Sequence, residues 1–329
     1  MKTIKTTLPT ESFDIKTFDA YFGGRSFAVL DIETTGLSAH NDSVILTGFL
    51  TYRNGELEFT QFFAQLPSEE HQVISATIDL LNTVDFIVTY NGKFFDIPFI
   101  AKRAAKNDLV FPDIYDLDLF LVFKHYSDIA KVLKSMTQKG LETYAGIDNR
   151  RTDTLNGMQS VKLYNQYVNT HSADMERQIL LHNSDDVLQL YRLLPLIRQA
   201  DIHRALQRHG FPVDGGRVKT ITYKHQELIL EGLCDDPLDY IKFPTTEEPY
   251  SLTMSKDGSF TLVIPCEKHG DSIYFDAAHL LDEHMISLDK YPGFASGFLI
   301  VKEDDMMNSA EINFFAMEFL PLLFELIHS

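Results

Sequence analysis

Phe27-Ala-Val-Leu-Asp-Ile-Glu-Thr-Thr-Gly-Leu37 places two carboxylates at the end of an apolar run. The run at 27–30 predicts a buried strand. Because side chains two residues apart leave the same face of a strand, Asp31 and Glu33 point together while Ile32 points into the core. Two carboxylates this close repel each other unless they share a proton or a metal ion. Hard divalent cations with oxygen ligands meet that need, so the stretch predicts a strand with a metal site at its end.

The composition is that of an ordinary globular protein. With 329 residues, the chain is long enough for two domains that each bury a core. Its 44% hydrophobic and 23% charged residues are typical values. Residues 1–26 are polar and no apolar run is long enough to span a bilayer, so we expect neither a secretory leader nor membrane association. Without export, Cys234 and Cys266 are expected to be reduced thiols of a cytoplasmic protein.

The net charge of −18 argues against general affinity for nucleic acid, which normally rests on Lys and Arg. Residues 201–329 have a balance of −12, whereas residues 1–200 have −6. Two bound divalent cations would leave the first part nearly neutral. The acidity predicts weak, salt-sensitive substrate binding or a partner that delivers the substrate. A basic stretch is either a solvated helical face or a phosphate-binding wall, and it contains Lys124, Lys131, Lys134, Lys139, Arg150 and Arg151.

The first two hundred residues alternate strands and helices. Asn54-Gly55 is a strong hairpin signal between apolar strands at 43–52 and 56–64. Further along, the pattern predicts a helix at 68–82, a strand at 85–89, a helix at 94–105, a short strand at 111–116 and interrupted helices to 198. This order predicts an α/β domain over residues 26–200, with a mixed sheet flanked by helices. Residues 1–25 are left as an N-terminal segment.

The remainder of the chain is expected to form a second, smaller domain. The turn-rich stretch 201–216 is predicted to be a linker. Asn308-Ser-Ala-Glu311 resembles a capping box before an apolar helix at 312–327. Residues 217–329 are therefore predicted to form a mostly-β accessory domain with a terminal helix. Its strands are expected at 217–223, 227–233, 250–255, 259–265 and 272–275.

A second acid stands where a strand gives way to a helix. In Tyr90-Asn-Gly-Lys-Phe-Phe-Asp-Ile-Pro98, Asp96 follows the predicted strand and turn and lies at the start of the next helix. An acid at this position either complements the helix dipole or serves as a ligand displayed at the end of the sheet. The helix dipole alone explains most acids at such positions. Asp96 is therefore a candidate ligand only in combination with the other acids of the chain.

A third element lies on the last long helix of the first domain. In Leu180-Leu-His-Asn-Ser-Asp-Asp-Val187, His182 and Asp186 are four residues apart and share one helix face. That face can place a carboxylate on a metal ion and an imidazole beside an attacking water. The alternative is a solvated His–Asp pair, which is common and contributes little. Asp185 points to another side of the helix and is expected to be solvated.

Together these elements supply what phosphodiester hydrolysis needs. Two cations a few ångströms apart activate the attacking water and stabilise the leaving oxygen, and carboxylates hold both cations. A histidine nearby can take or orient the proton of the water, because imidazole titrates close to neutral pH. Each element alone is a weak signal. Their order, a strand-borne Asp-x-Glu, then an Asp after a strand and turn, then a helical His-x-x-x-Asp, is far more specific.

In this order of motifs the chain resembles the DEDD superfamily of 3′–5′ exonucleases, which have a ribonuclease-H-like fold, and within it the YprB-like ribonuclease-H-like family. The matching segments cover roughly residues 26–198 and are DIETTGL at 31–37, YNGKFFDIP at 90–98, QKGLE with the following helices at 138–170, and HNSDDV at 182–187. The resemblance implies that two Mg²⁺ or Mn²⁺ ions are held by Asp31, Glu33, Asp96 and Asp186. It also implies that the 3′ end of a nucleic acid lies over Asp31, Ile32 and Glu33.

One departure from the family pattern concerns the histidine. The superfamily's third motif carries either Tyr three residues clear of the Asp or His four residues clear, and this chain has His182 at the tyrosine spacing. Two roles stay open for it: to orient the water, as the Tyr does, or to take its proton as a general base, as the longer-spaced His does. Asn91 and Lys93 lie near Asp96 and are candidates for contact with phosphate, with a turn role as the alternative for Asn91.

The function predicted from these residues is that of a cytoplasmic, metal-dependent nuclease that trims single-stranded DNA or RNA from the 3′ end. The alternative is a non-catalytic adaptor that retains the nuclease fold and binds nucleic acid or protein. Its acidic second domain would then be the docking surface for that partner. The retention of four acids and a histidine favours the enzyme, whereas the net charge favours the adaptor.

Overall fold

The computed structural model describes every residue of the chain except 10, 12, 154, 282–287, 289–296 and 329. The chain separates into two compact units, Met1–Ala200 and Asp201–Ser329. All the segments that carry the predicted acids and His182 belong to the first unit.

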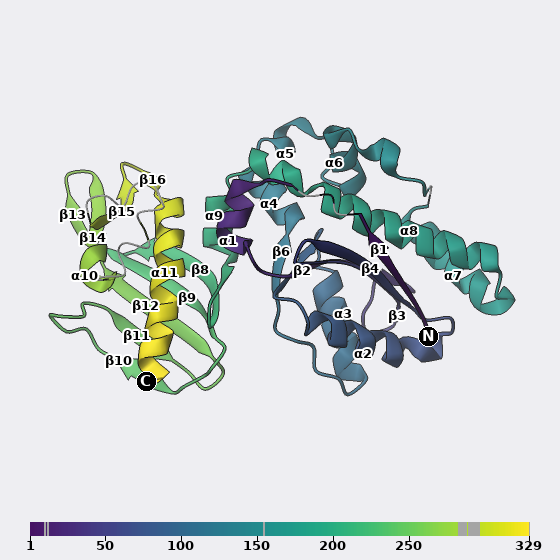
Figure 1. The fold of residues 1–329 in the computed structure, drawn as a ribbon, viewed down its shortest axis with the longest axis horizontal. Coiled ribbons are helices and arrows are strands. Elements are labelled where there is room, and N and C mark those ends of the chain that lie inside the picture. The colour runs from purple at the N-terminus through teal and green to yellow at the C-terminus, as the bar shows by residue number, and fades with distance from the viewer. Residues whose placement is uncertain (10, 12, 154, 282–287, 289–296, 329) are drawn as a thin grey trace. The chain divides into compact units, whose positions relative to one another are not determined.

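The first unit is built on a six-stranded mixed sheet, which confirms the predicted fold class (Figure 1). Its strands are β1 (Lys2–Leu8), β2 (Phe27–Thr34), β3 (Val44–Arg53), β4 (Glu56–Phe63), β5 (Phe86–Thr89) and β6 (Tyr115–Asp118). They stand in the order β1-β4-β3-β2-β5-β6. The pairs β2–β5 and β5–β6 are parallel, and the other neighbours are antiparallel. The hairpin between β3 and β4 turns at Asn54 and Gly55, both in the left-handed region.

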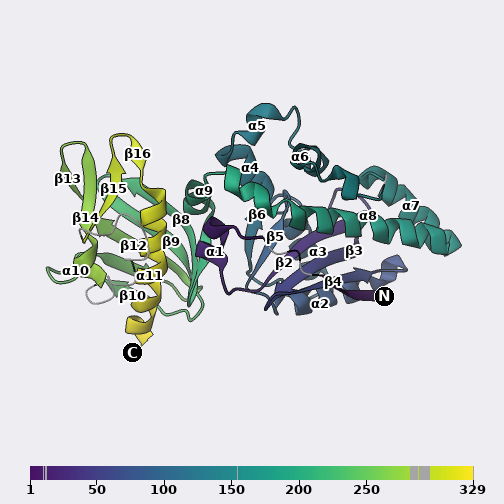
Figure 2. The same ribbon diagram turned by 45° about the horizontal axis from the view of Figure 1, so that its top comes forward.

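Helices cover both faces of this sheet, as Figures 1 and 2 show. The α-helices are α1 (Lys16–Phe22), α2 (Glu70–Leu81), α3 (Asp96–Lys106), α4 (Leu119–Tyr126), α5 (Ile129–Val132), α6 (Gln138–Ala145), α7 (Gly157–Thr170) and α8 (Ala173–Arg192). The 3₁₀ turns are η1 (Pro67–Glu69), η2 (Asp148–Arg150) and η3 (Leu194–Gln199). On one face, α2 packs against β3, β4 and α3; on the other, α8 packs against α7, β2 and β3.

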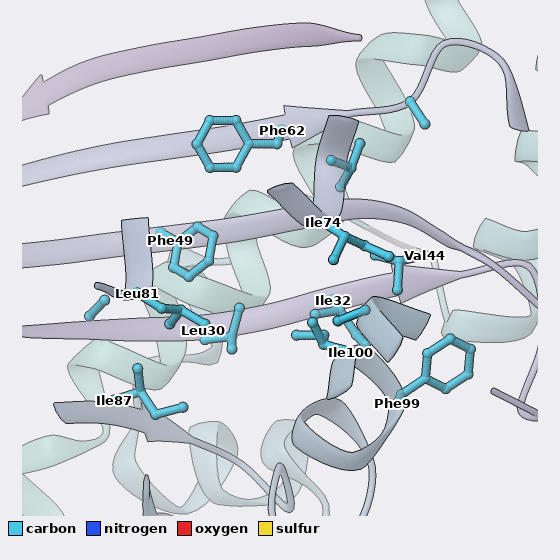
Figure 3. Packing of buried hydrophobic residues seen from close by; sticks show 14 residues of the cluster. Leu30, Ile32, Val44, Phe49, Phe62, Ile74, Leu81, Ile87, Phe99 and Ile100 are labelled. Carbon is cyan, nitrogen blue, oxygen red and sulfur yellow. The ribbon is translucent and has the colours of Figure 1, made fainter. Parts of the chain in front are cut away.

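The face toward α2 and α3 holds a large apolar core (Figure 3). In β2, Ala28, Leu30 and Ile32 point into this core, because alternate residues of a strand share a face. Each fully buried aliphatic or Phe side chain stabilises the fold by roughly 1.5–3 kcal/mol. A shift of β2 by one residue would turn this whole set away from the core, so the core fixes the register in which Asp31 and Glu33 leave β2 on the opposite face.

Two features of the first unit differ from the sequence prediction. β6 begins at Tyr115 instead of 111, because its partner β5 begins at Phe86, opposite Tyr115, and Pro112 has no N–H to give to a ladder. The N-terminal segment is an integral part of the fold, since β1 pairs with β4 along its full length. The same segment forms α1, which buries Phe18, Tyr21 and Phe22.

The second unit is mostly β. One antiparallel sheet has the strand order β10-β11-β12-β9-β8-β7, and a smaller one has the order β13-β14-β15-β16. The strands of the larger sheet are β7 (Phe211–Val213), β8 (Gly216–Lys224), β9 (Glu227–Cys234), β10 (Tyr240–Lys242), β11 (Ser251–Met254) and β12 (Ser259–Pro265). Those of the smaller sheet are β13 (Glu267–His269), β14 (Ser272–Asp276), β15 (Phe298–Glu303) and β16 (Met306–Met307). The helices are α9 (Ile202–His209), α10 (Ala277–Leu281) and α11 (Ser309–His328).

The segment predicted as a linker, 201–216, instead forms α9 and β7 of the second unit. Asp201 caps α9 by accepting a hydrogen bond from Arg204 N, and Ile202, Ala205 and Leu206 are buried along the helix. The glycines of this stretch therefore mark turns inside the unit. The prediction gave too much weight to turn residues and too little to the short apolar face between them.

The terminal helix α11 has a packed apolar face, with Ile312, Phe315 and Leu323 among its buried residues. Its Phe319 and Phe324 rings meet Tyr250 and Phe260 edge to face. Among the described residues, α11 included, no helix has the combined length and apolar character to cross a membrane.

Candidate metal centre

The carboxyl ends of three parallel strands meet at one edge of the first sheet. β2, β5 and β6 run in the same direction. The end of β2 carries Asp31 and Glu33, β5 is followed by the turn at 90–95, and the end of β6 carries Asp118. In open α/β sheets this is the edge at which ligands bind.

Asp31 is held by a chain of amide groups. Asn183 Nδ2 on α8 donates to Asp31 Oδ2 (2.8 Å) and to the Asp31 carbonyl oxygen (3.2 Å). Gln61 Nε2 on β4 in turn donates to Asn183 Oδ1 (2.9 Å). Gly48 on β3 lies opposite Asp31 on β2, and a Cβ at Gly48 would lie 2.0 Å from Asn183 Oδ1. Because Gly48 has no side chain, Asn183 of α8 has the space to reach Asp31 and hold it in place.

Asp96 joins the acids of β2 through the backbone between them. It is the first residue of α3 and is buried, and Ile32 N donates to Asp96 Oδ1 (3.2 Å). Since Ile32 separates Asp31 from Glu33, this bond brings a third carboxylate to the end of β2. The Ile32 side chain packs in the apolar core (Figure 3), so Ile32 contributes to this edge through its backbone.

His182 and Asp186 lie one turn apart on α8 and approach Glu33. His182 Nε2 is 3.5 Å from Glu33 Oε1 and 3.7 Å from Asp186 Oδ2. One ligand atom from each of the three residues lies within 4.8 Å of the others. This spacing allows one metal ion to contact all three side chains.

Burial and mutual repulsion raise the pKa values of the four acids. Burial, and then the charges of Asp186, Asp96 and Glu33, raise the pKa of Asp31 well above its ordinary value. Burial raises the pKa of Glu33 to about 7 against the opposing effect of His182. It also raises the pKa of Asp96 to about 7 and lifts the pKa of Asp186. Burial and the neighbouring charges therefore disfavour the ionised form of all four acids in the absence of a cation.

The donor set fits a divalent cation. Carboxylate oxygens are the ligands that Mg²⁺ and Mn²⁺ prefer. A bound cation would also remove the repulsion among Asp31, Glu33, Asp96 and Asp186 that disfavours their ionised forms. The structure thus brings the four predicted acids and His182 to one edge of the sheet, from β2, α3 and α8.

Sequence reasoning missed the arginine inside this centre. The basic stretch predicts Arg151 on a solvated face or a phosphate-binding wall, but its side chain is only 8% exposed. Its Nη2 lies 2.6 Å from Asp186 Oδ1 and 2.6 Å from Glu142 Oε1, and its Nη1 lies 2.6 Å from Asp153 Oδ2. The sequence holds no signal that separates Arg151 from Arg150, whose half-exposed side chain pairs with Glu11.

Asp185, predicted to be solvated, is buried and holds the loop that carries Arg151. Its Oδ2 accepts hydrogen bonds from Thr152 N (2.6 Å) and Asp153 N (2.7 Å). Helix periodicity places Asp185 and Asp186 on different sides of α8, as predicted. Helix periodicity cannot show that the loop with Thr152 and Asp153 covers the side to which Asp185 points. The prediction that Asp185 is solvated is therefore wrong.

Asn91 and Lys93 lie in the turn between β5 and α3. Asp118 Oδ1 accepts a hydrogen bond from Asn91 N (2.8 Å), and Asp118 Oδ2 accepts one from Lys93 N (3.3 Å). Asn91 has a left-handed backbone with φ 63°, a conformation that Asn tolerates in turns. The Lys93 side chain is exposed. Asp118, which the sequence did not single out, therefore anchors the turn that leads to Asp96.

The chain is similar to a known protein family, to a curated protein and to a solved structure. A family model described as the RNase_H superfamily matches residues 28–197. The uncharacterized protein YprB of Bacillus subtilis (strain 168) is 25% identical over 167 residues, which are 50% of this chain and 40% of that protein. The family B DNA polymerase from the hyperthermophilic archaeon Pyrobaculum calidifontis matches with 14% identity and a TM-score of 0.43, over 91% of this chain and 46% of the polymerase chain. Because the family model covers just over half of its residues, the chain belongs to the RNase_H superfamily.

Proposed function

We propose that this member of the RNase_H superfamily is a metal-dependent nuclease that hydrolyses phosphodiester bonds, acting from the 3′ end of single-stranded DNA or RNA. The observation that carries the proposal is the convergence of four acids, Asp31, Glu33, Asp96 and Asp186, beside His182. Buried charges that serve only the fold are normally paired within the chain. Here the raised pKa values of the acids point to a cation supplied from outside the chain.

Each side chain has a part that follows from its position. Asp31, Glu33, Asp96 and Asp186 would hold two Mg²⁺ or Mn²⁺ ions, which supply activation of water and stabilisation of the leaving oxygen. Asn183 and Ile32 N keep Asp31 and Asp96 in place for this task. His182 directs Nε2 toward Glu33 and Asp186, where it can accept a proton from the attacking water or orient that water.

Exposed residues beside the acids are suited to hold the substrate. Lys93 carries an exposed ammonium group three residues before Asp96, in reach of a backbone phosphate near the metal ligands. Phe94 is 66% exposed in the same turn and offers a ring on which a base can stack. Asn91 contributes chiefly by shaping this turn.

The second unit is proposed to serve a different partner. Its balance of −12 disfavours phosphate and favours a basic protein surface. The alignment with YprB spans 40% of that protein and half of this chain. Since this chain covers 40% of YprB, its substrate and partners are inferred from its own residues.

The variants Asp31→Asn and Asp186→Asn test the proposal, with the exposed Asp79→Asn on α2 as a matched control. Loss of a bound cation should remove roughly 4 kcal/mol of transition-state stabilisation, or about a thousandfold in rate. We expect end-labelled DNA or RNA to be shortened from the 3′ end by the wild type and by Asp79→Asn in Mg²⁺ or Mn²⁺, and not by the other two variants. Equal cleavage by Asp31→Asn and the wild type would reject the proposal. An adaptor would bind the strands and cleave them in no variant.

A further inference from the structure

A short loop brings two charged side chains, Arg151 and Asp153, to the metal centre. Arg151 lies between Glu142 on α6, Asp186 on α8 and Asp153 of its own loop. The side chains of Glu142 and Asp153 are each 1% exposed. Asp185 on α8 holds the loop in place by accepting hydrogen bonds from the backbone N–H groups of Thr152 and Asp153. Asp153 is thus a buried carboxylate with little freedom to move.

The two oxygens of Asp153 face different partners. Oδ2 lies 2.6 Å from Arg151 Nη1. Oδ1 accepts a hydrogen bond from Leu155 N (2.6 Å) and lies 3.1 Å from His182 Nδ1. The last contact is within hydrogen-bond distance but outside hydrogen-bond angles, and Nδ1 has no other partner among the described residues. Both oxygens are therefore surrounded by donor groups or by a ring nitrogen that can become one.

This contact favours one of the two nitrogens of His182 as the site of the ring proton. Burial alone would raise the pKa of Asp153, but the hydrogen bond from Arg151 holds that pKa below its ordinary value, which favours the ionised carboxylate. An ionised carboxylate only accepts hydrogen bonds, and a buried ring nitrogen beside it is therefore favoured as N–H. A neutral imidazole with its proton on Nδ1 presents a lone pair on Nε2. This is the nitrogen that faces Glu33 and Asp186, two carboxylates whose charge the bound cations would neutralise, whereas Asp153 keeps its charge.

We propose that Asp153 is a positioning residue that holds the proton of His182 on Nδ1, so that Nε2 faces the cation-loaded centre as an acceptor. Arg151 and Asp185 serve this arrangement by fixing Asp153. The inference rests on the proposed nuclease function for its kinetic consequence, but the position of the proton can be measured without substrate. The competing explanation is that Asp153 is only a counter-ion of Arg151.

The variant Asp153→Asn separates the two explanations. Because a charged donor is the stronger partner, the amide oxygen should stay with Arg151, and the NH₂ group should turn toward His182 Nδ1, with loss of the hydrogen bond that Leu155 N donates to Oδ1. The proton of the ring then has to move to Nε2. The same exchange in a Ser–His–Asp triad leaves the wrong tautomer and lowers kcat about 10⁴-fold. Glu142→Gln is the matched control, since it removes another buried carboxylate from Arg151 without touching His182.

The experiment is ¹⁵N NMR of protein labelled at its 12 histidines and loaded with Mg²⁺, with His182 assigned through His182→Gln. We expect Nδ1–H in the wild type and in Glu142→Gln, and Nε2–H in Asp153→Asn. Cleavage assays should show kcat reduced at least about 100-fold in Asp153→Asn with KM within twofold, and a much smaller loss in Glu142→Gln.

Two results would overturn the inference. One is Nε2–H in the loaded wild type, a measurement that needs no variant to fold. The other is an equal loss of kcat with an unchanged tautomer in Asp153→Asn and Glu142→Gln, as a structural role would give. If the wild type cleaves nothing while the tautomers follow the prediction, the nuclease proposal fails and the positioning of His182 stands.

Discussion

Two clusters of buried charge in the first unit are balanced differently. Between α2 and α3, Glu70 and Arg103 form an ion pair through two hydrogen bonds, and Glu70 Oε1 also accepts one from Val44 N (2.8 Å). At the carboxyl end of β2, by contrast, Asp31 and its three acidic neighbours outnumber Arg151. The first cluster is complete within the chain, and the second is not.

The difference separates a structural from a functional use of buried charge. A paired cluster holds two helices in register and needs nothing further. An unbalanced cluster destabilises the fold at neutral pH unless a ligand of opposite charge binds. Glu33, His182 and Asp186 are spaced so that they could hold a metal ion, and a divalent cation there would restore the balance of charge.

The largest effect on stability is expected when the paired cluster is broken. Arg103→Met leaves Glu70 buried without its partner, which should lower the free energy of unfolding by about 3–5 kcal/mol. Urea unfolding followed by circular dichroism measures this loss. Replacing both residues, with Glu70→Gln added, should recover part of it. A loss below about 1 kcal/mol in Arg103→Met would show that the pair is not a structural element.

The unbalanced cluster should show itself in the pH dependence of the metal-free protein. The folded state raises the pKa of Glu33 from 4.5 to about 7, so it binds protons more tightly than the unfolded chain does. The resulting stability is full below about pH 4.5 and is lost as the pH rises through 7. A shift of this size corresponds to a change on the order of 3 kcal/mol.

Thermal unfolding in chelator between pH 5 and pH 8 measures this effect. We expect Tm to fall with rising pH in the wild type, to fall less in Glu33→Gln, and to be restored at pH 8 by saturating Mg²⁺. Identical pH profiles of the wild type and Glu33→Gln would show that Glu33 is already neutralised within the chain.

A smaller effect is expected at the glycine that makes room for Asn183. In Gly48→Ala, the new Cβ would meet Asn183 Oδ1 at 2.0 Å, so Asn183 must move and release Asp31. The overpacking should destabilise the fold by about 1–3 kcal/mol and weaken Mn²⁺ binding. Gly157→Ala is the matched control, because a Cβ at Gly157 meets nothing within 4 Å. Unchanged Mn²⁺ affinity in Gly48→Ala would mean that Asn183 does not position Asp31.

The sequence predicts those parts of the first unit that depend on local periodicity. The alternation in β2 separates Ile32 from Asp31 and Glu33, and the helical spacing unites His182 with Asp186, because both are properties of a single element. The order of strands and helices also predicts the mixed sheet. These features lie within reach of one sequence because neighbouring residues determine them.

The parts that escaped prediction are set by contacts between distant segments. Nothing local distinguishes buried Arg151 from exposed Arg150, and Asp185 becomes buried only because a loop from another part of the chain covers it. In the same way β1 belongs to the sheet because β4 offers an open edge. The role proposed for Asp153 could not be predicted for the same reason, since it depends on a contact with His182, which is distant in the sequence.

Binding of Mn²⁺ itself tests most directly whether the acids at the end of β2 form a metal centre. Free Mn²⁺ can be counted by electron paramagnetic resonance during titration of the wild type, Asp31→Asn, Asp186→Asn and Asp79→Asn. We predict two ions bound per chain in the wild type and in Asp79→Asn, with at least one ion lost or bound more than tenfold more weakly in the other two variants. A wild type that binds no Mn²⁺, or an Asp31→Asn variant that binds it as the wild type does, would contradict the assignment.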